Sequence, residues 1–168
     1  IGESVRCAAR AADADHLPVA LVNLKLHCKN SQTDDSFAAR LQPDNPHPVN
    51  VFHVDAPGSR DLEHHHGAAF LRGKYSIGYW AWELPDFPDA WIHFSDYVDE
   101  VWAPSRFAAE AIAQKIPVPV LAMPHAISFE RPTGNLREKF GLAADKFLFL
   151  FLYDLNSYSE RKNPAAVI

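Results

Sequence analysis

The 168-residue chain lacks several features that would assign it to a class at once. It has no basic excess, because 16 Lys and Arg stand against 21 Asp and Glu, for a formal net charge of −5. A protein that binds bulk nucleic acid would carry the opposite balance, although one small basic site for a diphosphate is compatible with it. The longest apolar run, 147–153, is strand-sized and far below the roughly 20 residues of a membrane-spanning helix.

Cysteine is scarce, since Cys7 and Cys28 are the only two and form no Cys-x-x-Cys pair. We therefore expect neither a disulfide framework nor a cysteine zinc site, and we expect the protein to be located in the reducing cytoplasm. The chain starts with Ile without a signal-peptide pattern, and 163–168 resembles a helix cut off in its first turns. We therefore expect a chain truncated at both ends.

Common catalytic motifs are missing too: the sequence has no Gly-x-Ser-x-Gly elbow, Walker loop or His-Glu-x-x-His. Ser105 is accordingly predicted to be a helix N-cap and not a nucleophile. The run 64–66 is three histidines, but adjacent helix positions point in different directions and do not share a tetrahedral ion well. We expect neither a metal nor a cofactor.

What the sequence does contain is 48% hydrophobic and 12% aromatic residues, enough for the large core of a globular protein. Strand-like and helix-like segments alternate strictly, which predicts an α/β fold, a Rossmann-like parallel sheet with helices on both faces. The predicted strands are 19–24, 49–54, 75–82, 98–103 and 118–123, and the predicted helices are 3–15, 59–71, 86–94 and 106–115.

The pattern changes after Pro124. A linker over 129–133 and a short helix over 135–140 precede 147–152, whose uniformly apolar residues predict a strand buried on both faces. We interpret this part as the first βα unit of a second Rossmann-like domain, which divides the chain into 1–127 and 128–168. The isolated strand is expected to dock on the first sheet or to pair between chains.

Ligands of open α/β sheets bind at the carboxyl ends of the strands. His53 lies at the end of a predicted strand, and Asp55, Glu83 and His125 follow predicted strands. Gly2 opens the first helix at the same edge, where free N–H groups suit a phosphate. The alternative for Gly2 is an ordinary glycine that starts a helix, which a single glycine favours over a phosphate site.

Two further features have open alternatives. Glu83, beside Trp80 and Trp82, would be partly desolvated, with a raised pKa typical of functional carboxylates, or would cap the next helix. Arg161 and Lys162, predicted at a helix start that disfavours cations, would bind a diphosphate or face solvent. A group of aromatic side chains is suited to stacking on a sugar or to core packing: Tyr79, Trp80, Trp82, Phe87 and Trp91.

Four stretches in order closely resemble bacterial GT-B glycosyltransferases of the group 1 type, family four. They read YSIGYWAWELPDFP at 75–88, VDEVWAPSRF at 98–107, VLAMPHAI at 120–127 and RKNP at 161–164. This resemblance implies two Rossmann-like domains facing a cleft, the first for the acceptor and the second for a nucleotide-sugar donor. It also implies transfer with retention of configuration, no bound metal, and a donor phosphate that helps to deprotonate the acceptor.

Residue roles follow from the same resemblance. Arg161 and Lys162 would neutralise the leaving diphosphate, with Gly2 lining the cleft opposite them. The catalytic carboxylates would be Asp55 and Glu83, and the acceptor or sugar would be bound by His53, Trp82 and His125. The expected partners are a nucleotide-sugar and a glycan acceptor such as a growing polysaccharide, with peripheral membrane contact left open.

The chain ends before the paired glutamates that bind the donor in this family, so these 168 residues alone are not expected to catalyse transfer. The main alternative is a non-catalytic sugar- or nucleotide-binding module that acts with a partner chain. A nicotinamide-dependent oxidoreductase would need a complete Gly-x-Gly-x-x-Gly, of which only Gly2 is present.

Overall fold

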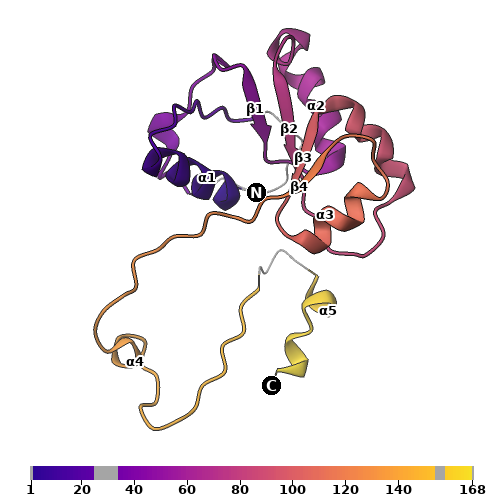
Figure 1. Ribbon diagram of the computed structural model, residues 1–168. Coiled ribbons are helices and arrows are strands. Elements are labelled where there is room, and N and C mark those ends of the chain that lie inside the picture. Colours follow the sequence, from indigo (N-terminus) through magenta and orange to yellow (C-terminus); the bar gives the residue numbers. More distant parts are fainter. Residues whose placement is uncertain (1, 25–33, 154–157, 168) are drawn as a thin grey trace. The chain divides into compact units, whose positions relative to one another are not determined.

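The computed structural model describes residues 2–24, 34–153 and 158–167. The chain falls into two units, Ile1–Ser128 and Phe129–Ile168, drawn from indigo through orange to yellow in Figure 1. Cys28 and Asp154 lie outside the described residues. Within those residues, no helix has both the length and the apolar character needed to cross a membrane.

The first unit is built on a four-stranded parallel sheet, which confirms the predicted α/β class with helices flanking the sheet. Its strands follow the spatial order β1-β2-β3-β4 (Figure 1). They are β1 (Val49–Phe52), β2 (Tyr75–Tyr79), β3 (Glu100–Ala103) and β4 (Val120–Ala122). All four therefore end at the same edge, where parallel sheets bind ligands.

The predicted strand at 19–24 is wrong. Only an isolated parallel bridge joins Leu21 to Leu41, with the Gln42 N–H donating to the Leu21 carbonyl at 2.9 Å. The physical reason is the sequence that follows Leu41, where Pro43 and Pro46 bring no N–H group to extend a ladder.

The helices of the first unit are close to their predicted places. They are α1 (Gly2–Ala14), α2 (Ala56–His66) and α3 (Arg106–Ala113), with 3-10 segments η1 (Ala38–Arg40), η2 (Ala68–Phe70) and η3 (Asp89–Tyr97). Ser105 is the N-cap of α3 as predicted, because its hydroxyl accepts from the Ala108 N–H at 3.1 Å. The predicted start of α2 at Ser59 is wrong: Asp55 caps this helix, three residues beyond the end of β1.

The main core lies on one face of the sheet, beneath α2, η3 and α3. Val101 and Ala103 of β3 pack there against Ile112 of α3, around the fully buried Trp80. The Trp80 indole N–H is satisfied by the Ser59 hydroxyl at 3.0 Å. The core-packing alternative is thus confirmed for Trp80 and Phe87.

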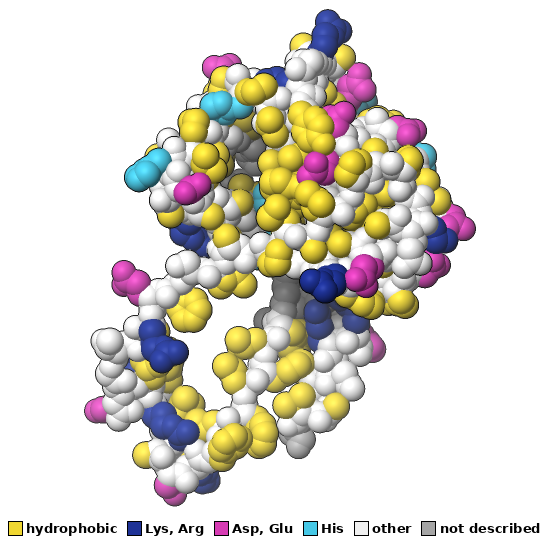
Figure 2. All heavy atoms as spheres, in the orientation of Figure 1, with side chains coloured by type: hydrophobic (Ala, Val, Ile, Leu, Met, Phe, Trp, Pro, Cys, Tyr) yellow, Lys and Arg dark blue, Asp and Glu magenta, His cyan; other side chains and the backbone are white. Residues whose placement is uncertain are grey.

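The opposite face of the sheet leaves several large side chains in solvent, although Ile77 and Tyr79 on this face are buried. Val49, Val51, Tyr75 and Leu121 are all exposed, and Figure 2 shows hydrophobic side chains gathered over the strands. Successive strand residues alternate between faces, so this face also carries the residue one step beyond β1, which is His53. The predicted cover of helices is therefore observed fully on one face only.

The second unit differs from its prediction. It holds the short helices α4 (Leu136–Lys139) and α5 (Ser159–Lys162) and the 3-10 turn η4 (Pro164–Ala166). The strand predicted at 147–152 is wrong, because these residues are not in a strand and Phe147 and Phe149 are each 84% exposed. Its alternating Phe and Leu residues make both faces apolar, which requires a surrounding sheet that the described residues do not supply.

Candidate functional site

Four side chains from separate elements meet at the carboxyl ends of the strands. Tyr79 is the last residue of β2, and His53 follows the end of β1. His125 lies beyond β4, and Ser4 comes from the first turn of α1. We call this set, Ser4, His53, Tyr79 and His125, the histidine cluster.

Ser4 and Tyr79 connect the two histidines. The Ser4 hydroxyl lies 2.7 Å from Nδ1 of His53 and 3.2 Å from Nδ1 of His125. The Tyr79 ring stacks against each imidazole, with centroid distances of 4.7 Å to His53 and 5.2 Å to His125. Its hydroxyl also donates to the Met123 carbonyl at 2.6 Å and lies 3.1 Å from Nδ1 of His125.

The local sequence explains why these groups converge. Parallel pairing brings the ends of β1 and β2 level, since Phe52 pairs with Gly78. The Met123 N–H donates to the Ala103 carbonyl at 2.7 Å, which continues the β4 ladder and directs the next residues toward β2. We also expected the first helix to start at this edge. The contacts of Ser4 with both histidines confirm that position.

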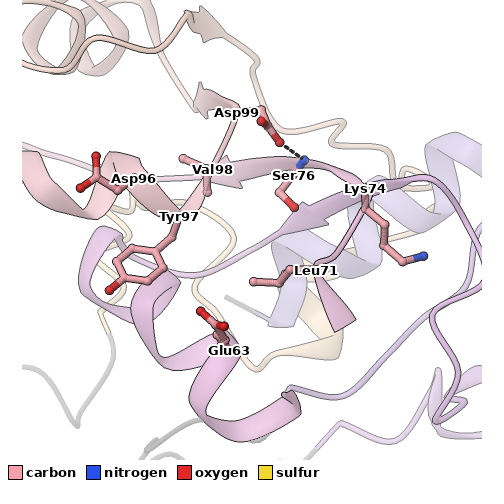
Figure 3. A pocket seen from close by; sticks show the side chains of 8 residues that line it. All are labelled: Glu63, Leu71, Lys74, Ser76, Asp96, Tyr97, Val98 and Asp99. Atoms are coloured by element: carbon pink, nitrogen blue, oxygen red, sulfur yellow. Dashed lines mark hydrogen bonds between the residues drawn. The ribbon is translucent and has the colours of Figure 1, made fainter. Parts of the chain in front are cut away.

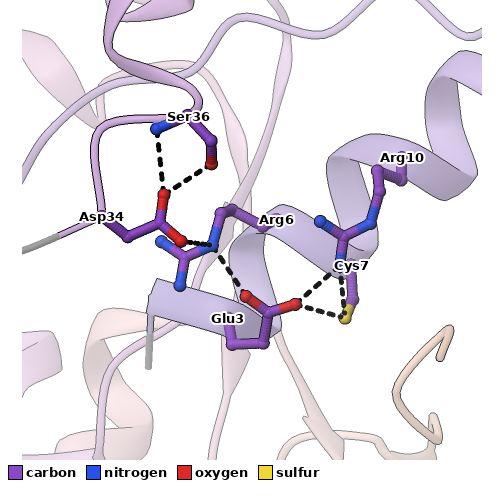
Figure 4. A network of polar contacts seen from close by, with 6 residues as sticks. All are labelled: Glu3, Arg6, Cys7, Arg10, Asp34 and Ser36. Carbon is purple, nitrogen blue, oxygen red and sulfur yellow. Dashed lines mark hydrogen bonds and ion pairs between the residues drawn. The ribbon is translucent and has the colours of Figure 1, made fainter. Parts of the chain in front are cut away.

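Ion pairs along α1 hold its first turn in shape (Figure 4). Glu3 accepts from Arg10 at 2.6 Å and from Arg6 at 2.7 Å, and Arg6 also pairs with Asp34 at 3.4 Å. Hydrogen bonds from Arg10 and then Arg6 lower the pKa of the Glu3 carboxyl to about 2. Glu3 is thereby engaged within its own helix and is not directed at a ligand.

The histidine cluster holds an uncharged His53 at neutral pH. Burial, and secondly the charge of His125, lower the pKa of His53 to about 4. Burial also raises the pKa of Tyr79. The Ser4–His53 contact has the distance of a nucleophile–base pair, but a base with so low a pKa has little tendency to accept a proton at pH 7. The cluster is better suited to hydrogen bonding than to activating Ser4.

The structure places the other sequence-predicted site residues outside this cluster. The Asp55 carboxylate is exposed and accepts from the Gly58 N–H at 2.9 Å, as the N-cap of α2. Glu83 is exposed, so its predicted desolvation is wrong, and the helix-cap alternative is wrong as well because η3 begins after Pro88 without a side-chain cap. Trp82 packs edge-on against Phe87 at 5.7 Å and belongs to the border of the core.

The three predicted diphosphate ligands lie in two different units. Gly2 is the exposed first residue of α1. Arg161 and Lys162 lie in the last turn of α5 in the second unit, so their predicted position at a helix start is wrong. Cations at the end of a helix do not oppose its dipole, so this position does not by itself require a ligand to explain the pair.

A pocket lies at the opposite edge of the sheet (Figure 3). It has a volume of about 230 Å³ and is lined by Ser76 and Asp99 near the starts of β2 and β3, together with Lys74. These groups are already paired: Asp99 accepts from the Ser76 N–H at 2.8 Å, and Lys74 donates to the Asn45 carbonyl at 2.7 Å. We therefore regard the histidine cluster, and not this pocket, as the candidate site.

Sequence reasoning found the two histidines but missed Ser4, and it placed Tyr79 in an aromatic group suited either to stacking on a sugar or to core packing. Tyr79 could have been found from its place near the end of a predicted parallel strand, since such ends meet at one edge of the sheet. No sequence signal pointed to Ser4. In the part of the chain that the structure describes, no three His, Cys, Asp or Glu side chains are grouped to hold a metal ion. No protein-family model, curated protein or solved structure matches this chain.

Proposed function

We propose that this chain is the acceptor-binding part of a retaining glycosyltransferase that uses a nucleotide-sugar donor. The observation that carries the proposal is the meeting of His53 and His125 at the carboxyl edge of a parallel sheet. Both residues are assigned to the acceptor or the sugar by the resemblance of the sequence to GT-B enzymes. The glycan acceptor and the cytoplasmic location belong to the same proposal.

The electrostatics of the cluster support this role. A lowered pKa of about 4 makes His53 a weak base, which suits a reaction in which the donor phosphate and not a protein side chain removes the acceptor proton. His53 would then orient the acceptor hydroxyl. Proximity and orientation supply much of the rate when the chemical groups come from the substrates.

Arg161 and Lys162 would act on the departing diphosphate. Negative charge develops on that group as the sugar leaves, and fixed cations stabilise it more in the transition state than in the ground state. An arginine fork and a lysine point charge are both suited to phosphate oxygens. Their position at the end of α5 is compatible with this contact to a diphosphate.

The test uses the full-length protein encoded by the open reading frame that contains these residues. It should transfer a labelled sugar from a nucleotide-diphosphate donor to a glycan acceptor with retained configuration. We expect His53→Ala to lower kcat/KM by about tenfold or more, equivalent to about 1.4 kcal/mol. His64→Ala, on the exposed end of α2, is the matched control and should leave the rate unchanged.

Calorimetry separates the enzyme from its main alternative. Nucleotide-sugar binding should be lost in Lys162→Ala and retained in Lys139→Ala, an exposed lysine of α4. A full-length protein that binds a sugar or nucleotide but transfers to no acceptor would instead be a non-catalytic binding module. Unchanged nucleotide-sugar affinity in Lys162→Ala would reject the diphosphate role.

A further inference from the structure

The positions of protons in the histidine cluster follow from counting donors and acceptors. Tyr79 has one hydroxyl proton, and the Met123 carbonyl, 2.6 Å away, can only accept. The proton of Tyr79 is therefore committed to Met123. The remaining contact of the Tyr79 oxygen, at 3.1 Å from Nδ1 of His125, requires that nitrogen to donate. His125 thus carries a proton on Nδ1.

The same reasoning assigns the hydroxyl proton of Ser4 and then the proton of His53. Since Nδ1 of His125 is a donor, the Ser4 oxygen accepts from it at 3.2 Å. The Ser4 proton then has one acceptor among the described residues, which is Nδ1 of His53 at 2.7 Å. Nδ1 of His53 is consequently unprotonated, and a neutral His53 carries its proton on Nε2.

We infer that Ser4 and Tyr79 hold the neutral rings of His53 and His125 in opposite tautomers, so that in this form the edge of the sheet presents one Nε2–H donor and one Nε2 acceptor. Within the described residues, neither Nε2 atom has a hydrogen-bond partner. Ser4 and Tyr79 are positioning residues in this arrangement, because they act on a ligand only through the imidazole rings.

The opposite tautomers favour one class of ligand. A hydroxyl group both donates and accepts, so it can use a donor and an acceptor together. An anion such as phosphate offers mainly acceptor oxygens, and the lone pair on Nε2 of a neutral His125 would repel them. Burial keeps His53 uncharged at neutral pH, which removes the positive charge that an anion would require. The site therefore fits a neutral polyhydroxylated ligand, and the identification of that ligand as a sugar acceptor rests on the proposed function.

The assignment is tested by nitrogen-15 NMR of the histidine rings in the whole chain at pH 7. We expect a protonated, pyrrole-type Nδ1 in His125 and an unprotonated, pyridine-type Nδ1 in His53. Tyr79→Phe removes the main acceptor for His125 and should shift its population toward the other tautomer while leaving His53 unchanged. Ser4→Ala should change the Nδ1 shift of His53, whereas the exposed His64 reports no change in either variant.

The same spectra test the ligand class with methyl glucoside and inorganic phosphate as probes. Methyl glucoside should perturb both Nε2 signals in the wild-type chain and lose this effect in Tyr79→Phe. A response to phosphate alone, or to neither probe up to the solubility of the sugar, would overturn the hydroxyl assignment. An unprotonated Nδ1 in His125 would overturn the tautomers themselves. Tautomers are measured without any donor, so they can hold even if the protein transfers no sugar.

Discussion

The hydroxyl of Ser4 lies 2.7 Å from Nδ1 of His53, a residue 49 positions further along the chain. This contact joins the first turn of α1 to the end of β1, where the imidazole is partly buried and also stacks on Tyr79. Burial disfavours the charged form of His53. The stability of the protein therefore depends on pH through this residue.

Acidification should destabilise the fold between pH 6.5 and 4. The pKa of His53 falls from 6.5 to about 4 on folding, so the unfolded chain binds more protons in this window. The contribution of His53 is fully present above pH 6.5 and is lost as the pH falls toward 4, by about 2–3 kcal/mol. Urea unfolding at several pH values should show this loss, and His53→Gln should reduce it while His64→Gln does not. The prediction would be contradicted if the free energy of unfolding changed with pH equally in the wild type and in His53→Gln.

Removal of the Ser59 hydroxyl should destabilise the core. Ser59 is fully buried and accepts from the Trp80 indole N–H at 3.0 Å, so Ser59→Ala leaves a buried donor without its partner. The expected cost is about 1–3 kcal/mol. Chemical denaturation followed by tryptophan fluorescence measures it, with the exposed Ser128→Ala as the control. A loss no larger than that of the control would show that Trp80 finds another acceptor.

Gly78 should not tolerate a methyl group. A Cβ atom at this position would lie 2.5 Å from Nε1 of Trp80, whose ring is fully buried and cannot move aside. Overpacking of this kind typically costs about 1–3 kcal/mol, so Gly78→Ala should lower the thermal midpoint clearly. Gly2→Ala is the contrast, because its Cβ would meet only the flexible end of Arg6 at 3.3 Å. Equal midpoints for the two variants would refute the steric argument.

Asp55 offers a test between a cap and a catalytic carboxylate. Asp55→Ala should cost about 1 kcal/mol of stability through loss of the α2 cap. Asp55→Asn keeps an oxygen acceptor for the Gly58 N–H and should retain most of that stability. Sugar transfer by the full-length protein then decides the role: activity retained in Asp55→Asn supports a cap, and activity lost in a stable Asp55→Asn supports catalysis.

Local chemistry made much of the first unit predictable from sequence. Ser105 before an alanine-rich segment specified the start of α3, and the two tyrosines and the isoleucine within 75–79 favoured β2. The strand predicted at 147–152 failed for a different reason. A segment that is apolar on both faces forms a strand only between neighbours that cover it, and the described chain contains none for it.

The candidate site also has features that the sequence predicted and features that it did not. The order of strands and helices determined that His53 and His125 follow parallel strands, and parallel strands end at one edge. The helical position of Arg161 and Lys162 could not be inferred, because it depended on whether α5 begins or ends there.

The sequence by itself determined the α/β class, the direction of the strands and the two histidines at their ends. Tertiary structure alone decided that Ser4 and Tyr79 join those histidines and that Asp55 caps a helix. The physical reason is range: strand and helix preferences act over a few residues, whereas a hydrogen bond such as that of Ser4 with His125 spans 121 positions. Such a bond depends on packing that brings distant segments within hydrogen-bonding distance of each other.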